Sequence, residues 1–483
     1  MKLEYNKKNS EKKRGNSKSV VLIHPFAKTP PFGIMSIASF LKKHGKKVRI
    51  VDYTHGNISK KQILNDIKGA DIIGISVYTM PMLKHACRIT KIIRKEFKGF
   101  LVWGGVHATL FPEKSIKEMD LDGVIVNEGE ITFLELVDAI EKKKPIEKVK
   151  SIVIKKGKNI IFTEKREPIY DMSILPKYDW RIINPEKYIT KNLLRGRRSI
   201  LLVESRGCPF NCAYCYVNKM FGCKWRGREP DEIISEMVYL NKKYNITHFD
   251  FLDDLPFGGK KNKMLKFCNK LAPLNFSWTS DYRVNCVDRD VITAMKKANC
   301  KYIYFGIESG SLRILKMINR NMTIEMAENA FSLCNEIGIS TMAGFIAGFP
   351  TETEEDLKLT IKVMKKLKPT LTRVTKFVPY PGGELYEKSI EMGFKLPKKT
   401  EGFADLGDYV NEGINISSIP DKKIRKARNF ARFLSIKNTI LFSFKHKDFG
   451  YMPYFILDSL PPRISRLIVG FLRFITKPIR TKS

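Results

Sequence analysis

Near-continuous apolar segments alternate with amphipathic segments over residues 19–150 of this chain. The apolar segments read SVVLIHP, KVRIVDY, IIGISVY, FLVWGGV and GVIVNEG. Segments with helical spacing of apolar residues separate them, as in GIMSIASFLKKHG after the first. Strands that are apolar throughout are buried on both faces, which is typical of a parallel sheet covered by helices. We therefore expect an N-terminal α/β domain with a doubly wound, Rossmann-like sheet over residues 19–150.

The strand-then-helix pattern continues between residues 199 and 381. The six predicted strands read SILLVE, HFDFLDD, FSWTSDYR, YIYFGIES, STMAGFIAG and RVTKFVPYP. Each ends in polar or Gly-rich residues, and barrel-type sheets place their reactive groups at that end of the strands. Six repeats therefore predict a partial (β/α)6 barrel of the TIM type rather than a second open sheet.

Three further segments complete the expected domain organisation. Residues 1–18 carry seven basic and two acidic groups with almost nothing apolar, so we expect a disordered basic tail. Residues 151–198 begin with an alternating hairpin around a Gly-Lys-Asn turn and continue as a Pro-interrupted linker. Residues 382–483 predict a mostly helical C-terminal region that ends in a basic amphipathic helix.

The predicted last helix carries apolar and basic residues on opposite faces. The apolar face holds Ile464, Leu467, Ile468, Phe471, Leu472 and Ile475. The other face holds Arg463, Arg466, Arg473 and Lys477. Such a helix is too short and too charged to span a bilayer, but it can lie in the interface, where each cation contributes about 1 kcal/mol near anionic lipid. Docking on the protein's own core is an equal alternative, whereas membrane contact would favour a lipid or prenoid substrate.

The chain is strongly basic. Its 483 residues include 87 Lys and Arg against 50 Asp and Glu, a formal net charge of +37. Such a charge attracts nucleic acid, anionic lipid or an acidic protein, although a generally Lys-rich composition explains it equally well. Lysines are spread along every segment rather than clustered with aromatic residues, which argues against a dedicated nucleic-acid groove. Nine cysteines and the lack of a signal peptide predict a reducing, cytoplasmic location.

The candidate chemistry centres on the run CPFNCAYC. It places Cys208, Cys212 and Cys215 on a short loop after a predicted strand. Three thiolates leave one iron of a [4Fe-4S] cluster without a protein ligand, and an open metal position serves chemistry, as it does in catalytic zinc sites. A structural zinc site requires a fourth Cys or His at a typical spacing. Cys223, in a Gly-, Lys- and Arg-rich stretch, is a poor candidate for it.

This cysteine run resembles the signature of the radical S-adenosylmethionine (SAM) enzymes. The resemblance implies that the amino and carboxylate groups of SAM chelate the open iron. It also implies that SAM is cleaved reductively to methionine and a 5′-deoxyadenosyl radical. Tyr214, between two of the cysteines, matches an aromatic residue that packs near the adenine. Glu308 and Ser309 in YFGIESGS match a motif that meets the ribose and amino-acid parts of SAM.

The same resemblance implies further SAM contacts on the second domain. GFIAGFP, with Gly344 and Gly348, matches the Gly-rich fifth strand that lies under the adenine. Asp253 and Asp254 end the second strand, where many relatives keep an acid, and are assigned to the SAM amino group. Arg283 ends the third strand and would balance the methionine carboxylate. For these acids and Arg283, a solvated loop or an internal ion pair is the alternative.

The first 150 residues resemble the cobalamin-binding domain that precedes the radical SAM domain in a large subgroup of that superfamily. The resemblance depends on GIMSIASFLKKHG, GISVYT, GGVHAT and VNEGEIT, which follow successive strands. Glycines at the strand ends let the backbone approach a bulky ligand. The cobalamin-binding candidates are Ser76, Gly104, Gly105, His107, Glu128 and Gly129.

The N-terminal domain departs from the cobalamin pattern at two places. No Asp-x-His-x-x-Gly element follows the first strand, so the resemblance implies cobalamin bound without histidine ligation. His24 lies there but precedes Pro25, and we expect it to be buried and satisfied. Asn127 replaces the usual Gly before EGE, a residue that still tolerates left-handed backbone. A cofactor-free Rossmann domain is the alternative.

Together the two resemblances imply a cytosolic, cobalamin-dependent radical SAM enzyme that methylates an unactivated carbon, for example of a lipid or prenoid. A low-potential ferredoxin or flavodoxin would supply the electron. The first alternative is an oxidative cyclase or other C–C bond-forming enzyme without net methylation, similar to the anaerobic magnesium-protoporphyrin cyclases. The second is a non-catalytic iron–sulfur sensor that binds nucleic acid or membrane.

Overall fold

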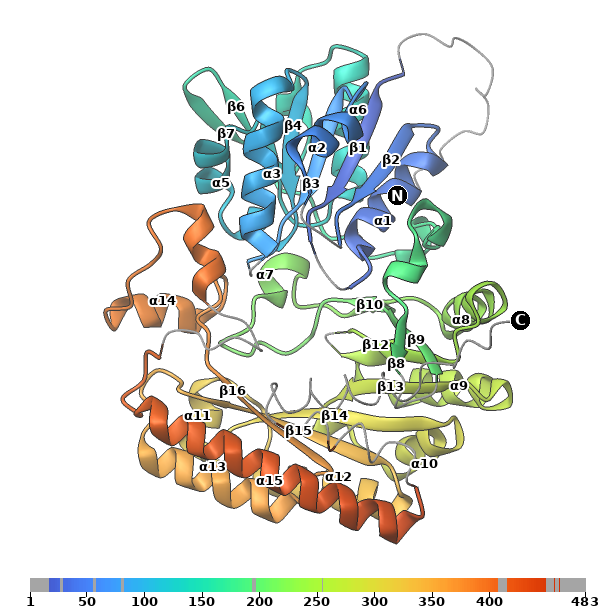
Figure 1. Cartoon of the computed structure of the whole chain (residues 1–483), viewed down its shortest axis with the longest axis vertical. Helices are drawn as coiled ribbons and strands as arrows, with labels where there is room; N and C mark the ends of the chain where they lie inside the picture. The colour runs from blue at the N-terminus through green and yellow to red at the C-terminus, as the bar shows by residue number, and fades with distance from the viewer. Residues whose placement is uncertain are drawn as a thin grey trace, which may run out of the picture.

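The computed structural model describes residues 17–448 except 27–28, 55–57, 80–81, 193–196, 254 and 407–414, together with residues 456 and 460. Most of the expected basic tail lies outside the described residues, as do Asp254 and the C-terminal amphipathic helix. The described part forms two α/β units, drawn one above the other in Figure 1.

The N-terminal unit contains a sheet with five parallel strands in the order β2-β1-β3-β4-β5. These are β1 (Ser19–His24), β2 (Lys47–Asp52), β3 (Ile72–Ser76), β4 (Phe100–Gly104) and β5 (Gly123–Ile125). The helices are α1 (Phe32–Lys43), α2 (Lys60–Asp66), α3 (Met82–Glu96), α4 (Val106–Leu110), α5 (Pro112–Met119) and α6 (Glu130–Glu141). This order confirms the predicted doubly wound fold and places a topological switch point between β1 and β3.

Two apolar cores cover the two faces of this sheet. Val21 and Ile23 of β1 belong to the core that includes α2 and α3, whereas Val20 and Leu22 belong to the core that includes α1 and α6. Successive side chains of a strand point to opposite faces, so a strand covered on both faces is apolar at every position. This is the physical reason for the near-continuous apolar segments.

The predicted hairpin consists of β6 (Ile152–Lys156) and β7 (Asn159–Phe162). It extends the N-terminal sheet, because β6 pairs antiparallel with β5. The alternation of residues 151–163 predicts two strands but does not identify their neighbour. The sheet therefore continues to Phe162, beyond the residue 150 expected from the sequence.

The second unit contains six parallel strands that are neighbours in chain order, as predicted for a partial barrel. They are β9 (Arg197–Leu202), β12 (His248–Phe251), β13 (Ser277–Tyr282), β14 (Cys300–Glu308), β15 (Ser340–Ala347) and β16 (Leu371–Lys376). The helices are α8 (Pro230–Tyr244), α9 (Lys261–Leu271), α10 (Arg289–Lys297), α11 (Leu312–Met317), α12 (Ile324–Ile337) and α13 (Glu354–Leu367). A short antiparallel strand that the sequence did not reveal, β8 (Thr190–Asn192), pairs with β9 at one edge.

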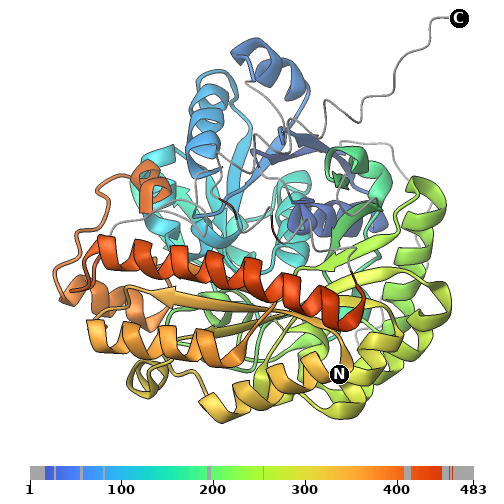
Figure 2. The same cartoon turned by 60° about the horizontal axis from the view of Figure 1, so that its bottom comes forward.

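The C-terminal region covers both units. The helix α14 (Glu384–Glu391) contributes Tyr386 to the apolar core of the N-terminal unit. The long helix α15 (Asp421–His446) lies along β16 at the outer edge of the second sheet, in red in Figures 1 and 2. No helix in the described part of the chain is long and apolar enough to cross a membrane.

Several helix ends follow directly from local sequence. Thr353 and Asp356 bond reciprocally in a capping box at the start of α13. The Asp288 side chain accepts the first backbone N–H groups of α10. Gly338, with a φ of 83°, ends α12 in the left-handed conformation.

Candidate active site

The three candidate cluster cysteines lie between two short strands, β10 (Ser205–Arg206) and β11 (Arg226–Gly227), which pair with each other. Cys212 is buried, whereas Cys208 and Cys215 are partly exposed. No group of three Cys, His, Asp or Glu in the described residues is arranged around a single metal ion. Cysteines that hold an iron–sulfur cluster do not converge on a single ion, because each thiolate binds its own iron.

Two buried guanidinium groups converge on Cys212. Arg283 Nη1 donates to Cys212 Sγ over 3.7 Å, and Arg320 Nη1 donates to the same sulfur over 3.6 Å. The Arg283 guanidinium also lies 3.6 Å above the centre of the Phe210 ring. Burial and the neighbouring Arg320 lower the pKa of Arg283. Two cations at one sulfur compensate negative charge on thiolates, so this donor set fits an anionic iron–sulfur cluster.

Arg320 is the functional candidate that the sequence reasoning missed. It lies twelve residues after Glu308, and Asn319, with a φ of 53°, turns the chain just before it. Its Nη2 donates to the carbonyl oxygen of Gly306 and lies 3.6 Å from Glu308 Oε1. Burial disfavours its charge, but Tyr214, Glu308 and Cys212 outweigh burial and hold the pKa of Arg320 above its ordinary value.

Tyr214 and Glu308, predicted separately, meet in the structure. The Tyr214 hydroxyl donates to Glu308 Oε1 over 2.9 Å. Glu308 ends β14 with a φ of 67°, a left-handed conformation that costs a non-glycine residue energy and clusters at functional sites. Cys212, Tyr214, Arg283 and Glu308 therefore belong to one group of contacts, completed by Arg320.

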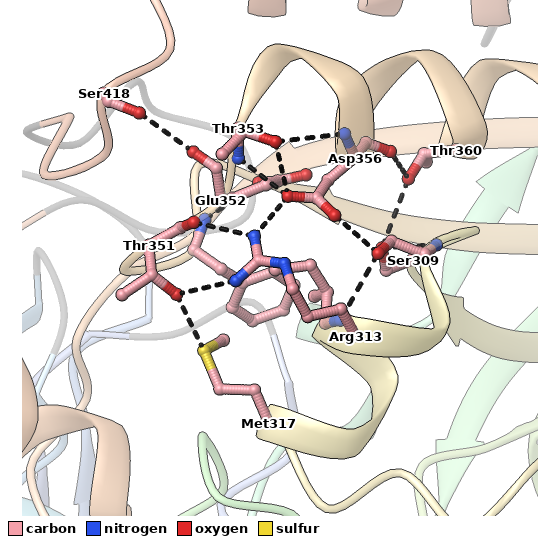
Figure 3. Close-up of polar contacts among 12 residues, drawn as sticks. Ser309, Arg313, Met317, Thr351, Glu352, Thr353, Asp356, Thr360 and Ser418 are labelled. Carbon is pink, nitrogen blue, oxygen red and sulfur yellow. Dashed lines mark hydrogen bonds and ion pairs between the residues drawn. The ribbon is translucent and has the colours of Figure 1, made fainter.

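Ser309 makes structural contacts in this group, and its contact with SAM stays a prediction. Its side chain is buried, with the hydroxyl 3.2 Å from Thr360 Oγ1 on α13 and accepting from the backbone N–H of Ser311. Figure 3 shows that this bond joins a larger network in which Arg313 pairs with Asp356. The described contacts give the Ser309 hydroxyl a structural role, in positioning the strand end that carries Glu308.

The two glycines at the fifth strand, Gly344 and Gly348, are required for different structural reasons. A Cβ at Gly344 would lie 1.9 Å from the Tyr304 hydroxyl, so this glycine makes room for a side chain of the neighbouring strand. Gly348 has a φ of 89°, which favours glycine. Glu352 supports that turn, because its Oε2 accepts from the backbone N–H groups of Gly348 and Phe349. Contact of either glycine with adenine remains a prediction.

Burial of Glu352 predicts a specific pH dependence of stability. Burial raises the pKa of Glu352 to about 7. Between its ordinary value of 4.5 and pH 7, the folded state therefore still holds the proton that the unfolded state has already released. The wild-type free energy of unfolding therefore falls as pH rises through this window. A Glu352→Gln variant lacks this loss and should gain roughly 3 kcal/mol relative to wild type between the two ends of the window. Urea unfolding at pH 5 and pH 8 measures the difference.

The matched control is Glu355→Gln, an exposed residue on α13, the helix that begins two residues after Glu352. Its unfolding free energy should follow the wild-type pH dependence. Parallel curves for wild type and Glu352→Gln would show that Glu352 is ionised throughout and would contradict the prediction.

The Asp253 carboxylate accepts hydrogen bonds from the protein backbone. Its Oδ1 accepts from the backbone N–H groups of Glu204 and Ser205 and from the Ser205 hydroxyl, at 2.8–3.0 Å. The carboxyl group of Glu204 is buried beside it, and burial together with Asp253 raises the pKa of Glu204 well above its ordinary value. These contacts fix the start of the cysteine loop, and the contact of Asp253 with the SAM amino group stays a prediction.

The glycine candidates of the N-terminal unit lie at the carboxyl ends of its strands. Gly105 has a φ of 97°, and a Cβ there would lie 2.9 Å from the Val77 carbonyl oxygen, so β3 and β4 approach closely at this edge. Ser76, half-buried at the end of β3, and Gly104, at the end of β4, are paired in the sheet. A Cβ at Gly129 would lie 2.8 Å from Ile37 Cδ1 of α1.

The two histidines of this edge are both buried. His107 packs between Phe111 and Phe403 with its Nδ1 3.0 Å from Thr79 Oγ1, and burial lowers its pKa to about 3. The expectation for His24 is half right. It is buried, and burial lowers its pKa to about 4, but neither ring nitrogen has a hydrogen-bond partner among the described residues.

Glu128, a cobalamin candidate, instead joins the two units. Its Oε1 accepts from Arg206 and its Oε2 from Arg226, each at 2.7 Å. Arg206 also pairs with Glu130, which accepts a bond from Ser36. The two arginines flank the cysteine loop on β10 and β11, so these buried ion pairs fix that loop against the N-terminal sheet.

Asn127 adds a second link between the units. It has a φ of 65°, the left-handed conformation that the sequence allowed. Its Nδ2 donates to the carbonyl oxygens of Lys219 and Met220 in α7 (Val217–Phe221), directly after the cysteine loop. The VNEGEIT segment thus contacts both sides of the loop.

Comparison with known proteins agrees with this two-part site. Residues 18–137 match the B12 binding domain family, and residues 203–364 match the radical SAM superfamily. An uncharacterised methyltransferase of Pyrococcus horikoshii is 32% identical over 87% of this chain and 91% of its own length. This chain belongs to the cobalamin-binding radical SAM family. As in other members of the family, a [4Fe-4S] cluster, SAM and cobalamin are its cofactors.

Two further relatives are similar over most of the chain. The anaerobic magnesium-protoporphyrin IX monomethyl ester cyclase of Rubrivivax gelatinosus is 29% identical over 76% of this chain and 67% of the cyclase. The radical SAM methyltransferase TsrM of Kitasatospora setae shares the fold with a TM-score of 0.69 and 16% identity, over 86% of this chain and 89% of that structure. The radical SAM family fold thus extends across both units.

The two arginines at Cys212 predict a redox effect in this radical SAM enzyme. Hydrogen bonds to cluster sulfurs stabilise the more negative, reduced state and raise the reduction potential. Arg320→Gln removes a cation and should lower the midpoint potential of the reconstituted cluster by tens of millivolts, whereas Arg320→Lys should lower it less. Potentiometric titration followed by EPR measures the shift. Arg289→Gln, at an exposed ion pair with Glu336, is the control and should leave the potential unchanged; an equal shift there would contradict the prediction.

Proposed function

We propose that this chain is a cobalamin-dependent methyltransferase that adds a methyl group to an unactivated carbon of a small molecule or lipid. One observation supports this above all. The loop with Cys208, Cys212 and Cys215 is locked against the cobalamin-type strand ends through Arg206 and Arg226. When bound, the cofactors supply the radical and the methyl group, and the protein orients them and excludes water.

The proposed roles of the side chains follow from their contacts. The three cysteines hold the cluster. Arg283 and Arg320, both buried beside Cys212, are placed to balance the carboxylate of SAM. Tyr214 and Glu308 hold each other and would meet its adenosyl part.

On the cobalamin side, the close-packed turn at Gly104 and Gly105 and the hydroxyl of Ser76 would meet the corrin. His107 and His24 are excluded as lower ligands in this proposal, because His107 packs among aromatic rings and the sequence around His24 lacks the ligating motif. Cobalamin would then bind without histidine ligation.

The test is anaerobic reconstitution with iron, sulfide and hydroxocobalamin, followed by incubation with SAM and dithionite. We expect 5′-deoxyadenosine without added substrate at a low rate, and S-adenosylhomocysteine in equal amount once the substrate is supplied. Absence of 5′-deoxyadenosine from fully loaded protein would overturn the proposal.

A second candidate function is oxidative cyclisation or other C–C bond formation without net methylation. The 29% identity to the Rubrivivax gelatinosus cyclase favours it. The same assay separates the two functions, because a cyclase forms 5′-deoxyadenosine without S-adenosylhomocysteine.

A low-potential ferredoxin or flavodoxin is the proposed electron donor. Both are acidic proteins, and the net charge of +37 would speed an encounter with them. The nine cysteines of the chain fit a reducing compartment.

Residues 461–483 are proposed to contact the inner face of the cell membrane as a basic amphipathic helix, which would bring a lipid or prenoid substrate within reach. Flotation of full-length protein beside a truncation that lacks these residues tests this point. Equal binding of both proteins would remove the argument for a lipid substrate.

A further inference from the structure

The outer face of α15 exposes large apolar side chains among lysines and arginines. Phe433 and Leu441 are 61% and 58% exposed, and Ile440 is exposed as well. At 100° per residue these positions share one stripe of the helix with Lys422, Lys426 and Lys437. Exposed apolar patches of this kind mark contact sites for proteins or membranes.

The opposite face of α15 is fixed to the barrel. The backbone N–H of Thr372 donates to Ser435 Oγ over 2.8 Å, and Asn438 Nδ2 donates to the Pro369 carbonyl oxygen over 2.9 Å. At the start of the helix, Asp421 pairs with Lys376 at 3.0 Å. The helix is thus held along β16 with a fixed outward face, which Figure 2 shows at the front of the molecule beside α13.

The charge of α15 identifies the kind of surface that would cover it. The helix carries eight Lys or Arg residues and one acid, Asp421, which the ion pair with Lys376 already engages. Protein interfaces are depleted in lysine. By contrast, aromatic and aliphatic side chains set among Lys and Arg are typical of helices that lie in an anionic bilayer interface.

We propose that the outer face of α15 binds the surface of an anionic membrane, with Phe433 and Leu441 inserted between headgroups. The inference extends the membrane contact proposed above to a described helix and depends on α15 itself, not on residues 461–483. It goes beyond methyl transfer, since it concerns where the enzyme resides.

The apolar half of α15 lies at the amino end of the barrel strands. Asn438 bonds to Pro369, just before β16, and Lys445 bonds to Asn335 near the end of α12. This is the amino end of the barrel strands, whereas the cysteine loop lies at their carboxyl end. Because the start of α15 lies at the carboxyl end of β16 and its end at the amino end, contact through α15 would place the side of the barrel against the bilayer.

Flotation of the full chain on vesicles tests the proposal. Wild-type protein should bind phosphatidylcholine vesicles that contain roughly 30 mol% phosphatidylglycerol, and not pure phosphatidylcholine vesicles. Phe433→Ser combined with Leu441→Ser should weaken binding about tenfold or more, because inserted apolar area is lost. The control combines Phe162→Ser and Leu312→Ser, two exposed positions on other elements, and should bind as wild type.

Two other outcomes of these experiments would overturn the proposal. Unchanged binding of the α15 double variant would assign the contact to another part of the chain, such as residues 461–483. If wild type forms a dimer in light scattering that the α15 double variant loses, and wild type does not bind vesicles, the face belongs to a second copy of the chain. The 5′-deoxyadenosine assay on the same variants keeps the two questions separate, since the α15 variants should retain wild-type SAM cleavage.

Discussion

A Cys212→Ala variant is expected to lose reductive SAM cleavage entirely. Cys212 is the buried member of the cysteine set and the sulfur to which both Arg283 and Arg320 donate. If Cys212 is a cluster ligand, as proposed, its loss removes that ligand, and it leaves Arg283 and Arg320 without their anionic partner. Loss of an outer-shell partner of a metal site costs about 10–100-fold, so loss of a ligand should cost more. Iron content, the absorbance of the cluster and 5′-deoxyadenosine formation measure the effect.

Cys223→Ala is the matched control for this experiment. Cys223 lies eight residues after Cys215 and is exposed and free. The variant should retain wild-type iron content and SAM cleavage. Full activity of Cys212→Ala, or loss of iron from Cys223→Ala, would show that the ligand set has been assigned wrongly.

The second large effect is expected at the ion pairs between the two units. Arg206→Ala should lower the free energy of unfolding by about 3–5 kcal/mol, because it leaves the buried carboxylate of Glu130 without a cation. Glu128 keeps Arg226. Arg206→Ala should also separate the cysteine loop from the N-terminal sheet and so reduce activity with cobalamin.

The pH dependence of this variant has a definite sign. Burial alone would raise the pKa of Glu130, but the pairing with Arg206 outweighs burial and holds it below the ordinary value. The stabilisation is therefore present above the ordinary pKa of a glutamate and is lost as pH falls through the lowered value. Without Arg206, burial raises this pKa instead, so the deficit of the variant should shrink as pH falls from 7 towards about 4.

Urea unfolding of wild type, Arg206→Ala and Arg289→Ala checks this prediction. Arg289 forms an exposed pair with Glu336, and exposed pairs contribute little. The control should therefore lose far less stability than Arg206→Ala. Equal losses would contradict the assignment of the interface to the buried ion pairs.

The strands could be predicted because their signals are local, and the cluster loop stays a prediction that depends on an equally local spacing. A strand buried on both faces is apolar at each position, and the cysteines lie within eight residues of each other. The edges of the sheets were less predictable. The pattern of residues 151–163 indicates a hairpin, but only the structure pairs β6 with β5.

Long-range contacts explain the rest of the difference. Arg320 lies 108 residues from Cys212, and no local pattern connects them. Glu128 looks like part of a ligand motif, and its partners Arg206 and Arg226 come from the other unit. Gly344 is explained by Tyr304 on a neighbouring strand.

Mössbauer spectroscopy of ⁵⁷Fe-reconstituted protein, before and after addition of SAM, tests the central claim most directly. Three cysteine ligands leave one iron of the cluster open, so we expect one of its four irons to differ from the other three and to change when SAM binds. If the Mössbauer signals of all four irons stay the same when SAM is added, the cluster has no open iron, which would contradict radical SAM chemistry at this site.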